Sequence, residues 1–114
     1  MRAAFVFIFA ALAMCGNSST TEAKAVDGFR LAEMCAQSAL NAQCESYVLG
    51  VVDVYASMTK SPRLCLPHDL DRAELVDAVR KYVRSHPEEG QYSAHSIVLR
   101  AVDEKFPCRA PKKK

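Results

Sequence analysis

Residues 41–58 read NAQCESYVLGVVDVYASM, and this stretch decides the fold class of the chain. Its apolar side chains recur every three or four residues, which is the spacing of one face of an α-helix. They are Cys44, Tyr47, Val48, Val51, Val54, Tyr55 and Met58. The valine-rich segment 47–56 would also suit a buried strand. We predict a helix because the spacing persists from Cys44 to Met58 and no other segment offers a partner strand.

Two residues of this stretch carry more specific predictions. Asn41 is the expected N-cap, since an asparagine side chain can accept a hydrogen bond from a first-turn N–H. Gly50 costs a helix about 1 kcal/mol relative to alanine. We attribute its presence to close packing against a neighbouring helix.

The helical spacing recurs in the segment that precedes this stretch. From Gly28 to about Gln37 the sequence predicts a short amphipathic helix, with Leu31, Ala32 and Cys35 on its apolar face. After the stretch, two prolines interrupt residues 60–70, so we expect a loop there.

Two more helices are expected after the loop. Asp71 caps the first, with Glu74 as its reciprocal partner, and this helix stops before Pro87. Ser93 caps the second, which Pro107 ends. The apolar faces of the two helices consist of Leu75, Val76, Val79, Tyr82 and Val83, and of Ala94, Ile97, Val98, Ala101, Val102 and Phe106.

The first 25 residues have the pattern of a secretory signal peptide. Arg2 precedes an unbroken apolar run over residues 3–14, which is too short to cross a bilayer as a helix. The preferred cleavage site, Ala23-Lys24-Ala25, leaves a mature chain that starts at Val26, and Ala11-Leu12-Ala13 is a second candidate. A lipoprotein anchored through Cys15 is disfavoured, because Met14 stands where lipoprotein signals carry a small residue. All of these alternatives place the protein outside the cytoplasm.

Four cysteines remain after the leader: Cys35, Cys44, Cys65 and Cys108. No C-x-x-C pair is present, and the three histidines do not stand at metal-ligand spacing, so a zinc site is not indicated. An even number of cysteines in a small exported domain predicts two disulfides. The resulting fold class is all-α, a small disulfide-crosslinked bundle of about four helices.

The expected arrangement of the helices indicates which of the cysteines can pair. In an up-and-down bundle Cys35 and Cys44 lie at one end and Cys65 and Cys108 at the other, which favours pairing within each end. On the loop-entropy model these crosslinks contribute about 2.6 and about 4 kcal/mol. The long loop could instead carry Cys65 back to Cys44 and leave Cys35 with Cys108, so both pairings stay open.

Composition and charge exclude several classes of function. The chain has 114 residues, enough for one domain, and only 4 glycines, so it lacks a glycine-rich phosphate loop. Its net charge of +2 comes largely from the basic C-terminal tail, residues 109–114, and the body of the domain is slightly acidic. This balance is not that of a nucleic-acid-binding protein.

The sequence does not point to an enzyme. A hydrolase needs a nucleophile, a base and an orienting group in one cleft. His95 and Ser96 are neighbours on a helix and therefore point apart. His86 suits the end of a helix, near the terminal carbonyls, and Asp53 suits a solvated helix face. We predict no catalytic residue, no metal and no cofactor.

The ordered set of cysteines, prolines, glycines and apolar residues resembles the Rap/Tai family of small periplasmic proteins. The residues that carry the resemblance are Asp27-Gly28, Leu31, Cys35, Cys44, Tyr47, Gly50-Val51, Asp53, Cys65-Leu66-Pro67, Leu75-Val76, Tyr82, His86-Pro87, Ala94, Ala101 and Phe106-Pro107-Cys108. The resemblance implies a Rap/Tai-like helical domain over residues 26–108, between a signal peptide (1–25) and the tail. Residues 88–92 and the tail depart from the family pattern.

The resemblance also implies a function. Characterised members are immunity proteins that inhibit peptidoglycan amidase effectors of the type VI secretion system by occluding the active-site cleft. It therefore implies a periplasmic toxin inhibitor with a protein partner. Some members of the family are homodimers, and the resemblance leaves open whether this chain is one. The shared residues are scaffold residues, so the resemblance assigns no contact residue.

The loop at 60–70 is the expected contact region. It is the longest loop, a disulfide and two prolines stiffen it, and its polar residues Lys60, Arg63, His68 and Asp69 could contact a partner. An envelope chaperone that opens in acid is the alternative function, which the acidic body permits and two disulfides oppose. A structural envelope module is a third.

Overall fold

The computed structural model describes Gly16 and residues 24–58 and 64–108, and these residues form a helical domain. The elements are α1 (Gly28–Ala36), the 3-10 turn η1 (Ser38–Leu40), α2 (Asn41–Met58), α3 (Arg72–Ser85), the 3-10 turn η2 (Pro87–Glu89) and α4 (Ala94–Lys105). No strand occurs within this part of the chain. The predicted all-α class with four helices is confirmed.

Asp71 and Ser93 stand at helix N-caps as predicted, and Asp27, for which no cap was predicted, is the N-cap of α1. The Asp27 carboxylate accepts from the Arg30 N–H at 2.9 Å and caps α1, and the Asp71 carboxylate accepts from the Ala73 N–H at 3.2 Å and caps α3. Ser93 occupies the N-cap position of α4 with extended backbone, as predicted. Its hydroxyl, however, pairs with that of Ser96 at 2.7 Å instead of with a backbone N–H.

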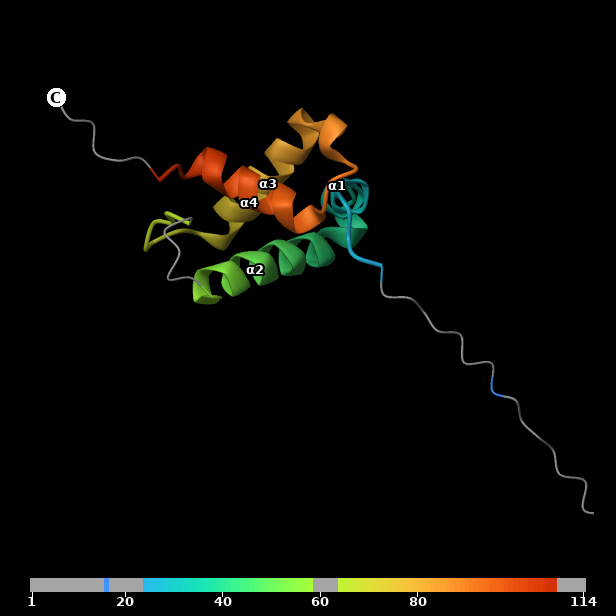
Figure 1. Cartoon of the computed structure of the whole chain (residues 1–114), viewed down its shortest axis with the longest axis horizontal. Coiled ribbons are helices and arrows are strands. Elements are labelled where there is room, and N and C mark those ends of the chain that lie inside the picture. Colours follow the sequence, from blue (N-terminus) through green and yellow to red (C-terminus); the bar gives the residue numbers. More distant parts are fainter. Residues whose placement is uncertain (1–15, 17–23, 59–63, 109–114) are drawn as a thin grey trace, which may run out of the picture.

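The four helices enclose one core. α3 packs against α4, and α2 lies beside α4, while α1 is seen end-on at the N-terminal end of α2 (Figure 1). α1 therefore crosses α2 steeply, and the arrangement is not a simple up-and-down bundle. The buried core residues are Leu31, Met34, Cys44, Val48, Val52, Leu75, Val76, Val79, Ala94, Ile97, Val98, Ala101 and Val102.

The stretch 41–58 is helical throughout, but two details of its prediction are wrong. Asn41 has helical backbone angles (φ −55°, ψ −43°) because η1 leads directly into α2 without a reversal, so it is no N-cap. Gly50 is exposed, and a Cβ built on it would meet no atom of residues 24–58 and 64–108 within 4 Å, so none of the described helices packs there.

The buried side of α2 is also narrower than the apolar pattern predicted. Its buried residues follow a spacing of four, at Cys44, Val48 and Val52. Val54 and Met58, predicted to face the core, are 48% and 76% exposed.

A backbone clamp joins the start of the domain to the turn before α4. Asp27 and Ser93 form an isolated antiparallel bridge, and the Ala94 N–H donates to the Val26 carbonyl at 2.9 Å. The Gly28 N–H donates to the Tyr92 carbonyl at 2.8 Å. The sequence gives no side-chain signal for this contact, which holds residues 26–28 against residues 92–94.

Two disulfides crosslink the helices. Cys35, in the last turn of α1, pairs with Cys44, in the first turn of α2, with 4.9 Å between their Cα atoms. Cys65 pairs with Cys108, with 5.2 Å between their Cα atoms, and ties the segment before α3 to the segment after α4. This is the pairing within each end, one of the two that the sequence left open.

Candidate functional site

The predicted contact loop is described only in part. Lys60 and Arg63 lie outside the described residues. His68 and Asp69 form an exposed turn, closed by the Leu70 N–H donating to the Pro67 carbonyl at 3.3 Å. The Cys65–Cys108 disulfide anchors this segment, so the structure brings two of the four predicted contact residues together on a tethered surface turn.

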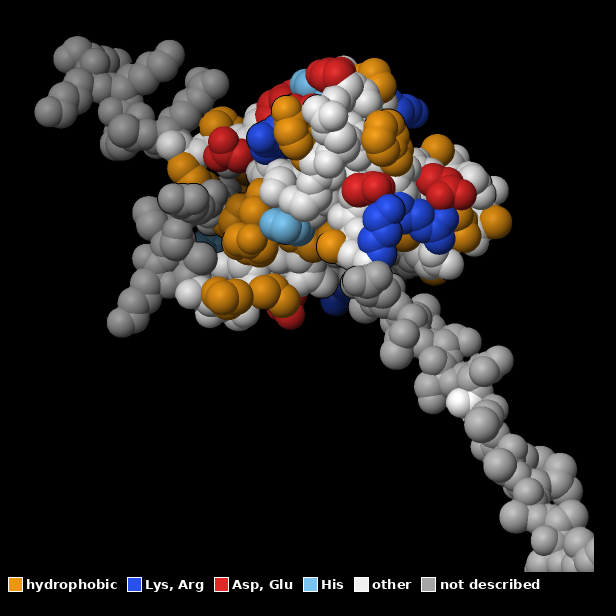
Figure 2. All heavy atoms as spheres, turned by 45° about the vertical axis from the view of Figure 1, so that its right-hand side comes forward, with side chains coloured by type: hydrophobic (Ala, Val, Ile, Leu, Met, Phe, Trp, Pro, Cys, Tyr) orange, Lys and Arg blue, Asp and Glu red, His pale blue; other side chains and the backbone are white. Residues whose placement is uncertain are grey.

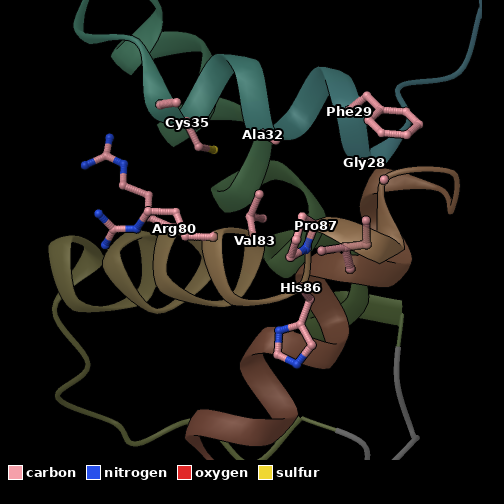
Figure 3. Close-up of a pocket in the computed structure, with 12 residues that line it drawn as sticks. Gly28, Phe29, Ala32, Cys35, Arg80, Val83, His86 and Pro87 are labelled. Atoms are coloured by element: carbon pink, nitrogen blue, oxygen red, sulfur yellow. The ribbon is translucent and has the colours of Figure 1, made fainter.

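A groove of about 400 Å³ runs between α1 and α3, with η2 at one end (Figure 3). Its lining is mostly apolar or small, and consists of Gly28, Phe29, Ala32, Cys35, Ala36, Val83, Pro87, Gly90 and Ile97, together with Arg80, Arg84 and His86. Phe29 stands at the η2 end with 65% of its surface exposed. Its ring packs over the backbone of Gly90, where a Cβ would collide with it.

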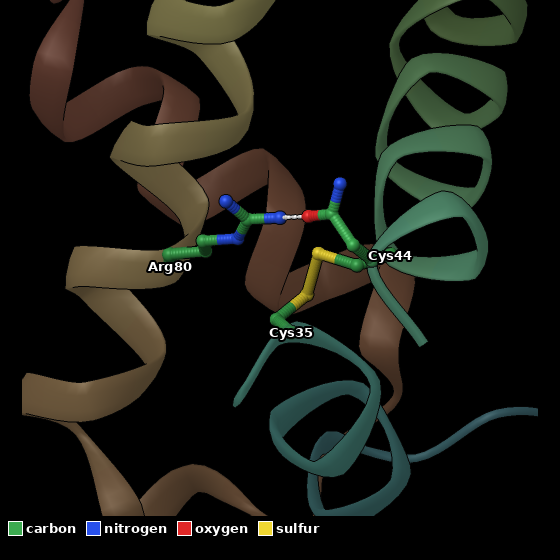
Figure 4. The surroundings of a disulfide bond; sticks show 4 residues. Cys35, Cys44 and Arg80 are labelled. Carbon is green, nitrogen blue, oxygen red and sulfur yellow. Dashed lines mark hydrogen bonds between the residues drawn. A yellow bond between two sulfur atoms is a disulfide. The ribbon is translucent and has the colours of Figure 1, made fainter. Parts of the chain in front are cut away.

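Two arginines of α3 supply the charge of the groove. Arg80 and Arg84 are four residues apart and so lie on the same side of the helix. Arg80 donates through Nη2 to the Asn41 side-chain oxygen, beside the Cys35–Cys44 disulfide (Figure 4). The Nε of Arg80 is buried without a hydrogen-bond partner, and within residues 24–58 and 64–108 neither arginine forms an ion pair with a carboxylate.

A polar cluster stabilises the connection between α3 and α4. The Tyr82 hydroxyl donates to the Glu89 carboxylate, with oxygen distances of 3.1 and 3.2 Å, and Arg100 forms an ion pair with Glu89 at 3.1 Å. Burial, and then the hydrogen bond to Glu89, raise the pKa of Tyr82. The Arg100 guanidinium also lies 5.0 Å from the ring centre of Tyr92. These contacts hold η2 in place and so fix one end of the groove.

The histidines do not form a catalytic arrangement with their neighbours. His86 ends α3, where its Nδ1 lies 2.9 Å from the Tyr82 carbonyl, as the sequence predicted for a helix-end residue. His95 stacks on Tyr55 and lies 3.5 Å from the Ser93 hydroxyl, while Ser96 points to Ser93 instead. A serine and a base in a working pair lie about 2.6–3.2 Å apart, with a third group to orient the base.

The remaining features of the surface concern metal ligands, membrane-spanning helices and the distribution of charge. Within the described part of the chain, no group of three or more histidine, cysteine or acidic side chains is placed to hold a metal. Nor does any helix there combine the length and apolar character that crossing a bilayer requires. Asp53 is exposed on α2. Apolar side chains are scattered among charges of both signs on the face shown in Figure 2.

Comparison with known proteins assigns the domain. A family model of Rap1a immunity proteins matches residues 27–108, from the N-cap of α1 to the last disulfide cysteine. The chain belongs to the Rap1a immunity protein family. No curated protein and no solved structure matches it. Membership of this family points to an immunity function against a secreted effector, exerted by binding a protein.

The groove of this Rap1a family member was missed from sequence. Arg80, Val83, Arg84 and Pro87 are spaced by three, one and three residues and so follow one side of α3 and its end. That spacing was the available signal. It could not show that α1 leaves this side partly uncovered, because the approach of α1 depends on the backbone clamp.

Proposed function

We propose that this protein is a periplasmic immunity protein that binds and inhibits a peptidoglycan amidase effector of the type VI secretion system. The observation that carries the proposal is the family match over the whole disulfide-bonded domain, residues 27–108. The amidase target comes from the sequence resemblance to the Rap/Tai family.

Two features support an exported protein. Residues 1–25 have the pattern of a signal peptide with cleavage after Ala25, and this segment lies outside the described residues apart from Gly16, Lys24 and Ala25. The two disulfides are of the kind that form and persist in oxidising compartments. The proposed form is therefore a soluble periplasmic chain that starts at Val26.

The crosslinked fold suits an inhibitor. A surface that is already ordered loses less conformational entropy on binding, so more of the contact energy appears as affinity. We propose that the turn at His68 and Asp69, with Lys60 and Arg63 in the preceding segment, contacts the toxin. The support is that this segment is exposed and is tethered by the Cys65–Cys108 disulfide.

The direct test is co-expression. An amidase effector of the type VI secretion system is exported to the periplasm of a sensitive strain, with and without the full-length chain. We expect the chain to restore growth and to co-purify with the toxin. A matched version that lacks residues 1–25 should give no protection, because it stays in the cytoplasm. If the full chain neither restores growth nor co-purifies with the toxin, this toxin is rejected as the target.

The contact surface is tested separately. Alanine at Lys60, Arg63, His68 and Asp69 should weaken the complex without changing the thermal stability of the free protein. If binding is unchanged, the immunity function stands and the contact lies elsewhere.

The alternative function, a chaperone activated by acid, predicts that the fold opens at low pH, whereas an inhibitor stays folded. Acid opening requires carboxylates whose charge stabilises the fold. The hydrogen bond from Lys81 lowers the pKa of Asp77, but this carboxylate is at the surface, and the buried part of the described chain contains no charged side chain. Thermal unfolding at pH 7 and pH 3, with a client aggregation assay, separates the two functions. Client protection confined to acid would favour the chaperone.

A further inference from the structure

We propose that the groove between α1 and α3 receives a short extended segment of the toxin that presents an apolar side chain next to a carboxylate. This inference rests on the proposed function, because it assumes that the partner is a folded protein toxin. It adds a second contact surface to the loop at 60–70 and states the chemistry of the segment that fits it.

The groove is held open by both ends of α1. At the N-terminal end, the Phe29 N–H donates to the Gly90 carbonyl at 3.0 Å, and Gly28 approaches so closely that a Cβ on it would lie 2.5 Å from Ile97 Cδ1. At the C-terminal end, Cys35 is joined to Cys44 of α2. The separation of α1 from α3 is therefore fixed before any partner arrives, which lowers the entropic cost of binding.

The η2 end of the groove offers an apolar anchor. Phe29 is exposed over 65% of its surface although it belongs to the helix that lines the groove, and Pro87 and Ile97 extend the apolar surface around it. Aromatic side chains, phenylalanine included, are enriched at protein interfaces relative to the rest of the surface. This end fits a leucine, isoleucine or phenylalanine of the partner.

The other end of the groove calls for a negative charge. Arg80 donates through Nη2 to the neutral side-chain oxygen of Asn41, so this contact leaves the positive charge of the guanidinium without a counter-charge. Arg84 lies one turn further along the helix and has no carboxylate partner in the described part of the chain. The nearby carboxylate of Asp77 is already bound to Lys81 at 3.0 Å. An incoming aspartate or glutamate would satisfy these donors with charge-assisted hydrogen bonds.

The distance between the two ends sets the spacing in the partner. Arg80 is five residues before Ser85, the last residue of α3, which corresponds to about 7.5 Å of helix, and Pro87 lies two residues beyond it, so the ends are separated by about 10 Å. An extended chain advances about 3.3 Å per residue, so about three residues cover this length. The segment should therefore carry its acidic residue two to four positions from its apolar residue.

The experiment measures binding of a catalytically inactivated amidase effector, the one that the full chain neutralises in the co-expression test, to the mature chain. Phe29→Ala and Arg84→Gln should each weaken binding about tenfold, and the double substitution Arg80→Gln with Arg84→Gln about 10- to 100-fold. Matched controls remove an exposed apolar residue or an exposed basic residue that neither lines the groove nor flanks the segment 60–70. Val54→Ala and Lys81→Gln serve this purpose and should bind like the wild type.

A second variant separates the charge of Arg80 from its structural contact. Asn41→Ala removes the acceptor of the Arg80 hydrogen bond and keeps both positive charges. It should retain most of the affinity, whereas loss equal to that of the arginine variants would mean that the arginines act only by holding the fold. Melting curves of all variants confirm that they are folded.

The outcomes distinguish this inference from the proposed function. If the wild type binds the toxin and the groove variants bind equally well, the groove inference is wrong and the immunity function stands. If the groove variants abolish self-association measured by light scattering while toxin binding is kept, the occupant is a second copy and the inference is also wrong.

If the wild type does not bind the toxin, the proposed function fails for that toxin. Peptide binding then tests the groove inference independently of the toxin. The probes are acetyl-Leu-Ala-Ala-Glu-amide and its glutamine analogue, titrated into the isotopically labelled chain. Shifts confined to groove amides, seen with the glutamate peptide and lost in Arg84→Gln, would support the groove. Absence of such shifts would overturn it.

Discussion

The two helical glycines, Gly50 and Gly28, should respond in opposite ways to alanine. Gly50 lies in the middle of α2 and is exposed, and no atom of the described residues lies within 4 Å of the position of a Cβ. No described glycine has a positive φ, so alanine fits the existing backbone. The substitution Gly50→Ala should therefore stabilise the protein by up to about 1 kcal/mol. For a domain of this size that raises the melting temperature by about 4–8 °C.

Gly28→Ala tests the opposite environment. Its Cβ would lie 2.5 Å from Ile97 Cδ1, 2.8 Å from the Gly90 Cα and 2.9 Å from the Glu89 carbonyl oxygen. The last two atoms belong to the backbone of a turn that is held by hydrogen bonds, so they cannot move away cheaply. Overpacking of this kind costs about 1–3 kcal/mol.

Thermal and urea unfolding of both variants, followed by circular dichroism, measures the two effects. The wild type and both variants are compared with their disulfides intact. A loss of stability in Gly50→Ala would show that α2 packs against something at this position. An unchanged stability in Gly28→Ala would refute the close approach of α1 to the turn before α4.

Three further predictions follow from the crosslinks, the polar cluster and the leader. Cys65→Ala and Cys108→Ala should destabilise the domain by similar amounts, about 4 kcal/mol in urea unfolding, and by more than loss of the shorter disulfide, because their crosslink closes the longer loop. Because the pKa of Tyr82 is raised in the folded protein, its neutral hydroxyl contributes to the free energy of unfolding. This contribution is fully present below the ordinary tyrosine pKa near 10 and is lost as the pH rises through the pKa of Tyr82 in the folded protein. Tyr82→Phe should therefore lower stability at pH 7 by about 1 kcal/mol and reduce the further loss in alkali, as melting curves between pH 7 and 11 would reveal. N-terminal sequencing of exported protein should give Val26 as the first residue. A mature chain that begins at a lipidated Cys15 would contradict the soluble form.

The helices could be predicted from sequence because each carries a local signal. Asp27 and Asp71 are capping residues, Pro87 stops α3, and the apolar spacing of α3 and α4 matches their buried faces. In α2 the local signal is weaker, since apolar residues lie on most of its sides. The spacing there identifies a helix but cannot tell that Val52 is buried while Val54 is exposed.

Features that join distant segments could not be predicted. The clamp between Val26 and Ala94 is made by backbone atoms, so no side-chain pattern marks it. The groove exists because this clamp and the Cys35–Cys44 disulfide place α1 beside α3. Its arginines were visible in the sequence only as charges on a helix, and their position at the end of an apolar groove follows from packing.

The clamp also determines the order in which the domain can be completed. Residues 26–28 find their hydrogen-bond partners only in residues 92–94, near the other end of the domain. During synthesis the partner emerges from the ribosome long after α1 and α2, so the first helix has no fixed neighbour at its N-terminal end until almost the whole domain has been made. Contacts between segments so far apart in sequence form slowly. We expect such delayed closure to keep the newly made chain unfolded for longer, which suits the export that we propose for it, because an exported chain passes through a narrow translocation channel before it folds.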